Sequence, residues 1–165
     1  MPAVAPIGRT LAVMRRFVST RVDDAVAAAL LEEYVAYRIA TFPVGSVYRV
    51  STPDPSAFLA PAGVFLVAEV DGVPVGCGGV RDLGGGRWEV KHLWLRASAR
   101  GGGHGRALLT ELERLAAAGG AAELVLDTND SLTAAGVLYR SSGFEPIAAY
   151  NDNPNATTWF AKRLR

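Results

Sequence analysis

Apolar positions in the second half of the chain recur at the three- and four-residue spacing of an amphipathic helix. Charged residues at positions 111, 113 and 114 fall between them, and a glycine pair at 119–120 follows the last one. One apolar face of this kind predicts a helix that packs on a core, and the glycines predict its end. The apolar positions are Leu108, Leu109, Leu112, Leu115 and Ala116.

The segment between residues 63 and 95 shows short apolar runs separated by turn residues instead. Asp71-Gly72, a strong hairpin signal, separates a run over 63–71 from one over 73–82. Three glycines at 84–86 separate the second run from a third over 87–95. This pattern predicts three consecutive antiparallel strands.

The other segments alternate between strand and helix patterns. Asp23 or Asp24 can cap an alanine-rich helix that runs through Arg38. Four prolines between residues 41 and 63 predict a loop with one brief helix. Strands are expected over 11–19, 121–127, 145–150 and 156–164, and a helix over 131–142. The order predicts one α/β domain over residues 1–165, with a mixed, mostly antiparallel central sheet and flanking helices.

Composition narrows the class of protein. The 165 residues contain 17 Lys and Arg and 16 Asp and Glu, so the strongly basic balance of a nucleic-acid binder is absent. No apolar run has the length of a membrane span, and Arg9, Arg15 and Arg16 interrupt the apolar residues that a signal peptide would need. One cysteine allows no internal disulfide. We therefore expect a cytoplasmic protein without nucleic-acid or membrane partners.

A glycine-rich loop joins the third strand to the amphipathic helix. Arg100 precedes three glycines in a row, and Gly105 and Arg106 follow. Glycines let backbone N–H groups approach a ligand, and a helix start adds unpaired donors and a positive dipole end. Such a loop favours phosphate oxygens. It is not a nucleotide P-loop, which needs Lys and Ser/Thr after the last glycine, nor a Rossmann loop, because Leu108 occupies the final glycine position.

The spacing Arg-x-x-Gly-x-Gly, filled by Arg100, Gly103 and Gly105, resembles the pyrophosphate-binding signature of the GNAT superfamily of acyl-CoA-dependent N-acyltransferases. Residues 65–80 resemble the central hairpin of this family, 88–95 its fourth strand, and 138–144 its LY-x-x-x-GF element. The resemblance is nearly continuous from about residue 64 to the C-terminus.

The resemblance implies the GNAT fold, in which the strand over 87–95 splays away from the strand over 121–127. The free backbone would pair with the pantetheine of acetyl-CoA as co-substrate, and no metal is expected. The residues implied in binding acetyl-CoA are Leu93, Trp94, Leu95, Arg100, Gly101, Gly102, Gly103, His104, Gly105 and Arg106.

Glu89 is the expected general base, acting directly or through water. It stands four residues before Leu93, the spacing found in GNAT enzymes that use a carboxylate from this strand. Regular alternation puts Glu89, Lys91, Leu93 and Leu95 on one face and His92 on the other. His92 is the rival base, because its pKa lies near neutrality, and a β-bulge would reverse its face.

Tyr139 is the expected general acid, since the family places this hydroxyl near the cofactor sulfur and a phenol can protonate a thiolate. Leu132 stands where the family often has a cofactor-contacting asparagine, and Asn129 is out of register with it. Cys77 has no His or Asp at motif spacing, which favours a buried residue over a thiol nucleophile.

The acceptor is the least determined part of the sequence reading. Arg38 and Arg81 can hold a carboxylate, which suits an amino-acid-like amine, and Tyr150 and Asn151 lie in a polar segment between the last two strands. The leading interpretation is acetyl transfer to the primary amine of a small molecule, by direct attack in a ternary complex. A non-catalytic acyl-CoA sensor, a protein N-terminal or lysine acetyltransferase, and a homodimer stay open.

Overall fold

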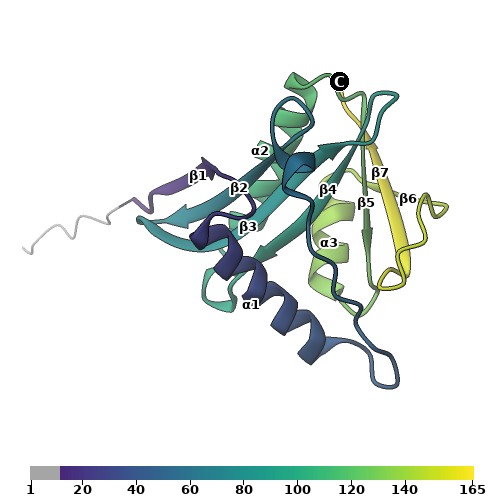
Figure 1. Cartoon of the computed structure of the whole chain (residues 1–165), viewed down its shortest axis with the longest axis horizontal. Helices are drawn as coiled ribbons and strands as arrows, with labels where there is room; N and C mark the ends of the chain where they lie inside the picture. Colours follow the sequence, from purple (N-terminus) through teal and green to yellow (C-terminus); the bar gives the residue numbers. More distant parts are fainter. Residues whose placement is uncertain (1–11) are drawn as a thin grey trace, which may run out of the picture.

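A computed structural model describes residues 12–165 and contains one seven-stranded mixed sheet (Figure 1). The strand order is β1-β2-β3-β4-β5-β7-β6, and β4 and β5 form the parallel pair among antiparallel neighbours. The strands are β1 (Arg15–Ser19), β2 (Gly63–Val70), β3 (Val73–Asp82), β4 (Arg87–Leu95), β5 (Glu123–Thr128), β6 (Glu145–Ile147) and β7 (Thr158–Arg163). The predicted α/β class with a mixed, mostly antiparallel sheet is confirmed.

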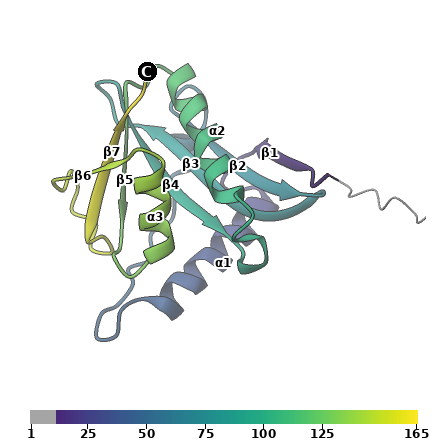
Figure 2. The ribbon, with the colours of Figure 1, turned by 180° about the vertical axis from the view of Figure 1, so that it is seen from behind.

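Three helices cover the two faces of the sheet. Helix α1 (Ala25–Thr41) lies on one face, and α2 (His104–Ala118) and α3 (Thr133–Ser141) lie on the other (Figures 1 and 2). Each face has its own apolar core. Leu108, Leu109 and Leu112 of α2 are fully buried on their side, and Leu30 of α1 packs with Phe58 and Phe65 on the other.

The helix ends follow the local sequence signals. Asp24 caps α1, because its carboxylate accepts a hydrogen bond from the Val26 amide at 3.1 Å. Gly103 precedes α2 with φ +76°, a left-handed conformation that glycine adopts without strain. The expected brief helix in the proline-rich loop is a 3-10 turn at Pro55–Phe58.

Strand β4 leaves β5 after only three residue pairs. Arg87, Trp88 and Glu89 pair with Glu123, Leu124 and Val125, and both strands then continue without each other. The remainder of β4, from residue 90 to 95, still pairs with β3 on its other side. The predicted splayed strand pair is therefore present, and from residue 90 onward the edge of β4 that faces β5 has no strand partner within residues 12–165.

A β-bulge interrupts β4 at His92. The register against β3 shifts between Cys77 and Gly79, and His92 has φ +56°. Regular alternation predicted His92 on the face opposite Glu89, with Leu93 and Leu95 on the Glu89 face, and this was wrong. Leu93 and Leu95 pack on the α2 side, whereas the His92 ring meets rings on the α1 side. The extra residue of the bulge reverses the order of faces.

The remaining boundaries differ by a few residues from the sequence reading. Strands β1, β6 and β7 are shorter than predicted, and position 11 lies outside the described residues.

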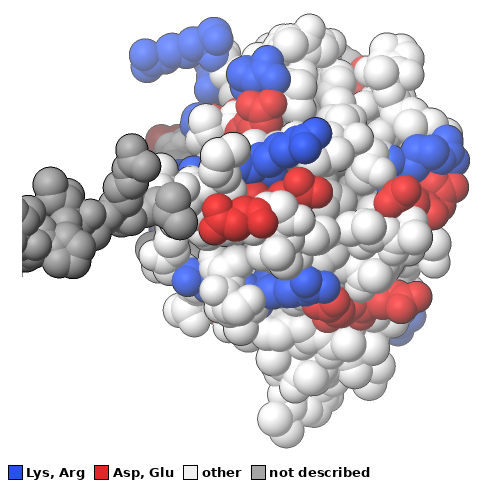
Figure 3. Space-filling view, turned by 90° about the vertical axis from the view of Figure 1, so that its left-hand side faces the viewer, with Lys and Arg blue, Asp and Glu red and all other residues white. Residues whose placement is uncertain are grey.

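Basic and acidic side chains lie next to one another on the face in Figure 3. Within residues 12–165, no helix has the length and apolar character to cross a membrane.

Candidate active site

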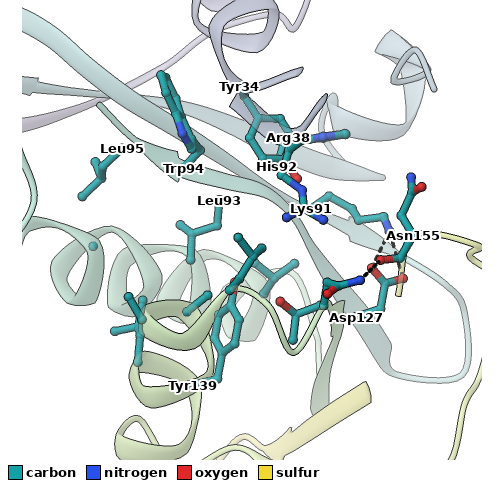
Figure 4. Close-up of a pocket in the computed structure, with 18 of the residues that line it drawn as sticks. Tyr34, Arg38, Lys91, His92, Leu93, Trp94, Leu95, Asp127, Tyr139 and Asn155 are labelled. Atoms are coloured by element: carbon teal, nitrogen blue, oxygen red, sulfur yellow. Dashed lines mark hydrogen bonds and ion pairs between the residues drawn. The ribbon is translucent and has the colours of Figure 1, made fainter. Parts of the chain in front are cut away.

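One cavity of about 930 Å³ passes through the sheet where β4 and β5 part. Its size is within the range of small-molecule sites. Leu93, Leu95 and Tyr139 line it on the α2 and α3 side, and Tyr34 and Arg38 of α1 line it on the other (Figure 4). The two faces of the sheet therefore share one site, and two reactants can meet there from opposite sides.

The glycine-rich loop closes the α2 end of this cavity. Gly101, Gly103 and Gly105 line it, and Gly101 and Gly103 have positive φ with open space where a Cβ would stand. The amides of the first turn of α2 have no intrahelical acceptor, so they can donate to a ligand. Because these donors stand at the positive end of the helix dipole, they suit a diphosphate.

Two arginines beside the loop are held in place by neutral groups. Arg100 donates to the Leu95 carbonyl at 2.9 Å and stacks on the Tyr37 ring at 4.8 Å. Arg106 donates to Ser141 Oγ at 2.6 Å. Both line the cavity, and no carboxylate within residues 12–165 is paired with either of them. Their charges are positioned for an anionic ligand such as a pyrophosphate.

Gly102 and His104 of the same loop do not line the cavity. Arg15 of β1 donates to His104 Nδ1 at 2.9 Å and to the Gly102 carbonyl at 3.4 Å. The His104 side chain is therefore engaged with β1. Of the loop residues expected to contact cofactor, these two can do so only through their backbone amides.

Tyr139 lies on α3 across the cavity from β4 (Figure 4). Its ring packs against Phe144 and Phe160, with centroid distances of 6.0 Å in each case. Burial raises the pKa of Tyr139 well above its usual value, and the nearby Asp127 charge adds to this. The hydroxyl stays protonated at neutral pH, which a general acid requires.

Glu89 is fully buried and does not line the cavity. Arg81 lies 2.6 Å from Oε2, Tyr150 donates to Oε1 at 2.8 Å, and Lys91 lies 3.3 Å from Oε1. Its oxygens are thus already bonded to three side chains. A direct contact between Glu89 and a substrate would require one of these partners to move.

His92 forms part of the cavity wall, beside the rings of Tyr34 and Phe58 at centroid distances of 6.1 Å and 5.8 Å. Burial, with smaller contributions from the charges of Lys91 and Arg81, lowers the pKa of His92 to about 4. The pKa near neutrality that was expected from the sequence is therefore wrong. The imidazole is therefore neutral at pH 7. Neither ring nitrogen is bonded to a residue in 12–165, so the ring can accept a proton from a ligand.

Sequence reasoning missed Asp127, which lines the cavity at the end of β5. Its carboxylate lies 3.2 Å from Lys91 Nζ and accepts hydrogen bonds from Asn151 at 2.7 Å and Asn153 at 3.0 Å. These contacts link the splayed strands to the polar segment before β7. A carboxylate at the end of the strand that follows the glycine loop was the available signal.

The four residues expected to contact the acceptor are not equivalent. Arg38 lines the cavity and can reach a ligand there, whereas Asn151 lines it with its amide bonded to Asp127 and Trp159. Arg81 lines it too, but its guanidinium is bonded to Glu89. Tyr150 is bonded to Glu89 and does not line this cavity.

Cys77 is buried, and its Sγ lies 3.6 Å from the His92 carbonyl oxygen. Burial raises the pKa of Cys77 to about 12, so the thiol stays protonated at neutral pH.

Comparison with known proteins identifies relatives. The model of the Acetyltransferase (GNAT) family matches residues 25–144. An IAA acetyltransferase of Azospirillum brasilense is 36% identical over 136 residues, covering 80% of this chain and 86% of that protein.

Solved structures share the fold. A GNAT acetyltransferase of Staphylococcus aureus superposes with a TM-score of 0.79 at 17% identity, covering 92% of this chain and 100% of that one. A Salmonella typhimurium structure solved with its cofactor acetyl-CoA gives 0.65 at 22% identity, covering 93% and 95%.

The lowered pKa of His92 has a consequence for stability. Its folded pKa lies below the ordinary value, so the unfolded chain binds the proton more readily, and stability falls as pH drops from about 6.5 toward 4. Between pH 7 and 5 we expect His92→Gln to reduce this loss by about 1–2 kcal/mol relative to the wild type. Urea unfolding at the two pH values measures the difference. His104→Gln serves as the control, and equal losses in wild type and His92→Gln would contradict the assignment.

Proposed function

The chain belongs to the Acetyltransferase (GNAT) family and is an acyltransferase, and we propose that it transfers the acetyl group of acetyl-CoA to the primary amine of a small molecule. The observation that carries this proposal is the cavity that crosses the sheet at the splay. A cofactor held from the α2 and α3 side and an acceptor held from the α1 side would meet there without a covalent enzyme intermediate.

The α2 half of the cavity has the groups that acetyl-CoA needs. The Gly101–Gly105 amides, Arg100 and Arg106 would bind the pyrophosphate. The unpaired edge of β4 at Leu93, Trp94 and Leu95 would pair with the pantetheine amides. Acetyl-CoA supplies the acetyl group and departs as the free thiol.

Acetyl transfer needs three groups from the protein. The acceptor nitrogen bonds to the carbonyl carbon, the carbon–sulfur bond breaks, the amine loses one proton and the sulfur gains one. A backbone N–H near Leu93 would donate to the carbonyl oxygen as charge develops on it. Tyr139, which stays protonated, would deliver the proton to the departing sulfur.

For the proton of the amine, the geometry supports His92 better than Glu89. His92 is in the cavity wall and neutral, with unbonded nitrogens, whereas Glu89 is behind the wall and bonded to Arg81, Lys91 and Tyr150. We therefore assign proton removal to His92. Glu89 then acts as a positioning residue that fixes the charges of Lys91 and Arg81.

A small acceptor suits the cavity better than a protein chain. Residues 51–54 line the α1 side, and Asn151, Asn153 and Asn155 line the end near β5. The Arg49 amide donates to Asn155 Oδ1 at 2.8 Å, which ties the two segments together. We infer that this bridge restricts the approach to the cavity from the α1 side. It favours a compact amine over a lysine on a folded protein.

Substitution of Gly103 tests the phosphate site. Gly103→Val places a branched side chain at a left-handed position beside the α2 amides, so acetyl-CoA should bind at least tenfold more weakly, about 1.4 kcal/mol. Isothermal titration calorimetry measures this. Gly72→Val is the matched control, because Gly72 also has positive φ with open space around it but lies in the β2–β3 turn. Equal affinities in the folded variants would refute the assignment.

Tyr139→Phe tests the general acid. The hydroxyl acts only as the thiolate departs, so kcat should fall by about 10²–10⁴-fold while acetyl-CoA affinity stays nearly constant. Thiol release measures kcat, and calorimetry measures the affinity. A change in kcat of less than about threefold, with chemistry shown to be rate-limiting, would leave Tyr139 as a packing residue.

The pair His92→Gln and Glu89→Gln separates base from positioning residue. His92→Gln should lower kcat on the order of 10²-fold and flatten the acidic limb of the kcat/KM profile, which the lowered pKa of His92 places near pH 4. Glu89→Gln should keep that limb. Because Arg81 and Lys91 lose a charge partner, this variant should instead show a higher KM or a lower thermal stability than the wild type.

The acceptor amine itself titrates and can imitate an enzyme base. Two amines of different pKa are therefore compared, since a limb that moves with the amine belongs to the amine. If Glu89→Gln abolishes a limb that His92→Gln retains, the carboxylate is the base and our assignment is reversed.

A further inference from the structure

Arg38 carries a buried charge that no other group in the described chain balances. The residue is 3% exposed, and Nη1 is buried without a hydrogen-bond partner in the described chain. No carboxylate within residues 12–165 is paired with it. Its guanidinium carbon lies 5.6 Å from the Phe42 ring centre and 5.2 Å from that of Tyr48. These rings cover the guanidinium faces but do not accept its in-plane N–H bonds.

The neighbouring charges are already paired. Glu89 takes Arg81, and Asp127 takes Lys91. Asp54, a further carboxylate on the wall, accepts hydrogen bonds from the Ser56 amide and hydroxyl at 2.9 Å and 2.8 Å. An isolated buried charge is unfavourable by several kcal/mol unless it is paired. Arg38 is therefore the position on this side where an anion from outside would gain most.

Arg38 does not flank the glycine loop, although Arg100 of the loop stacks on Tyr37, the neighbour of Arg38 in α1. Arg38 lies on the α1 side of the cavity with Tyr34, above Lys91 and His92, whereas Leu95 marks the other end of the same wall (Figure 4). Arg100 and Arg106 flank the loop on which the phosphates are proposed to bind. The anion at Arg38 would therefore belong to the acceptor.

We propose that Arg38 binds the carboxylate of the acceptor, so that the acceptor is a small amino acid whose amine is directed toward His92. This inference rests on the proposed function and adds the substrate class. A guanidinium edge offers two parallel N–H donors that match a carboxylate. Tyr34, Tyr48 and Phe58 supply aromatic wall beside it, which favours an amino acid with an apolar side chain.

The test compares amino acids with their primary amides as acceptors. Phenylalanine with phenylalaninamide, and leucine with leucinamide, differ in the carboxylate while keeping the amine and side chain. The two amines of a pair differ in pKa, so the acid-to-amide ratio of kcat/KM is compared between variants rather than read alone. Arg38→Met should lower this ratio at least tenfold, mainly through KM for the acid, with acetyl-CoA affinity unchanged. Thiol release and calorimetry give the two measurements.

Arg140→Met is the matched control. Arg140 also stacks on an aromatic ring, 5.2 Å from the centre of Phe160, but it does not line the cavity. Its loss should leave the ratio unchanged. Arg38→Met should fold at least as stably as the wild type, because an unpaired buried charge is removed. If it does not fold, Arg38→Lys keeps the charge without the planar edge and should lower the ratio by a smaller factor.

An acid-to-amide ratio that Arg38→Met leaves unchanged overturns the inference while leaving the proposed function intact. A wild-type enzyme that acetylates only amines without a carboxylate does the same. A wild-type protein that acetylates no amine at all contradicts the proposed function instead. In that case, calorimetric binding of phenylalanine that Arg38→Met abolishes would still support the carboxylate site.

Discussion

The parting of β4 from β5 is the constraint on which the rest of the site depends. The two strands pair over Arg87–Glu89 and Glu123–Val125 and then diverge. Strand edges normally satisfy their N–H and C=O groups on a neighbour, so an edge opened inside a sheet needs another partner. The opening also removes the barrier between the two faces. Helix α1 and helix α3 can therefore contribute side chains to one cavity although the sheet lies between them.

The bulge at His92 lets β4 place the His92 ring on the α1 side of the opening and the side chains of Leu93 and Leu95 on the α2 side. On a regular strand Leu93 would follow Glu89 to the α1 face, and the apolar wall of the α2 side would be lost. A non-glycine residue at φ +56° is unfavourable by roughly 1–2 kcal/mol, so the surroundings must hold it. The rings of Tyr34 and Phe58 meet the imidazole on that side, and the pairing with β3 resumes at Trp94. The backbone strain in β4 is thus located at His92, the residue whose side chain the proposed chemistry needs on the α1 side of the sheet.

Local patterns predicted what local physics determines. The spacing of the leucines gave α2, Asp71-Gly72 gave the hairpin, and the order of arginine and glycines gave the loop, because each depends on neighbours in sequence. The bulge depends on the register with β3, which alternation along β4 cannot reveal. The pair of Lys91 and Asp127 joins residues 36 positions apart, and no short motif marks it. The partners of the buried Glu89, Arg81 of β3 and Tyr150 before β7, are likewise distant in sequence, and its spacing to the loop does not reveal them.

Some charged side chains around the cavity are paired and others are not. The paired ones fix the geometry of the wall, and the unpaired ones remain able to bind an anion. Arg81, Lys91 and Asp127 line the wall, and the buried Glu89 lies behind it; their charges balance one another, so this part of the wall holds its geometry without attracting ions. Among the Lys and Arg residues that line the cavity within residues 12–165, those without a carboxylate partner are Arg38 on α1 and Arg100 and Arg106 at the glycine loop. Salt screens exposed charges strongly and buried ones weakly. On the proposed function, the exposed loop arginines would attract the phosphates over a distance in a salt-dependent way, whereas the buried Arg38 would select at contact for a group that replaces its missing partner.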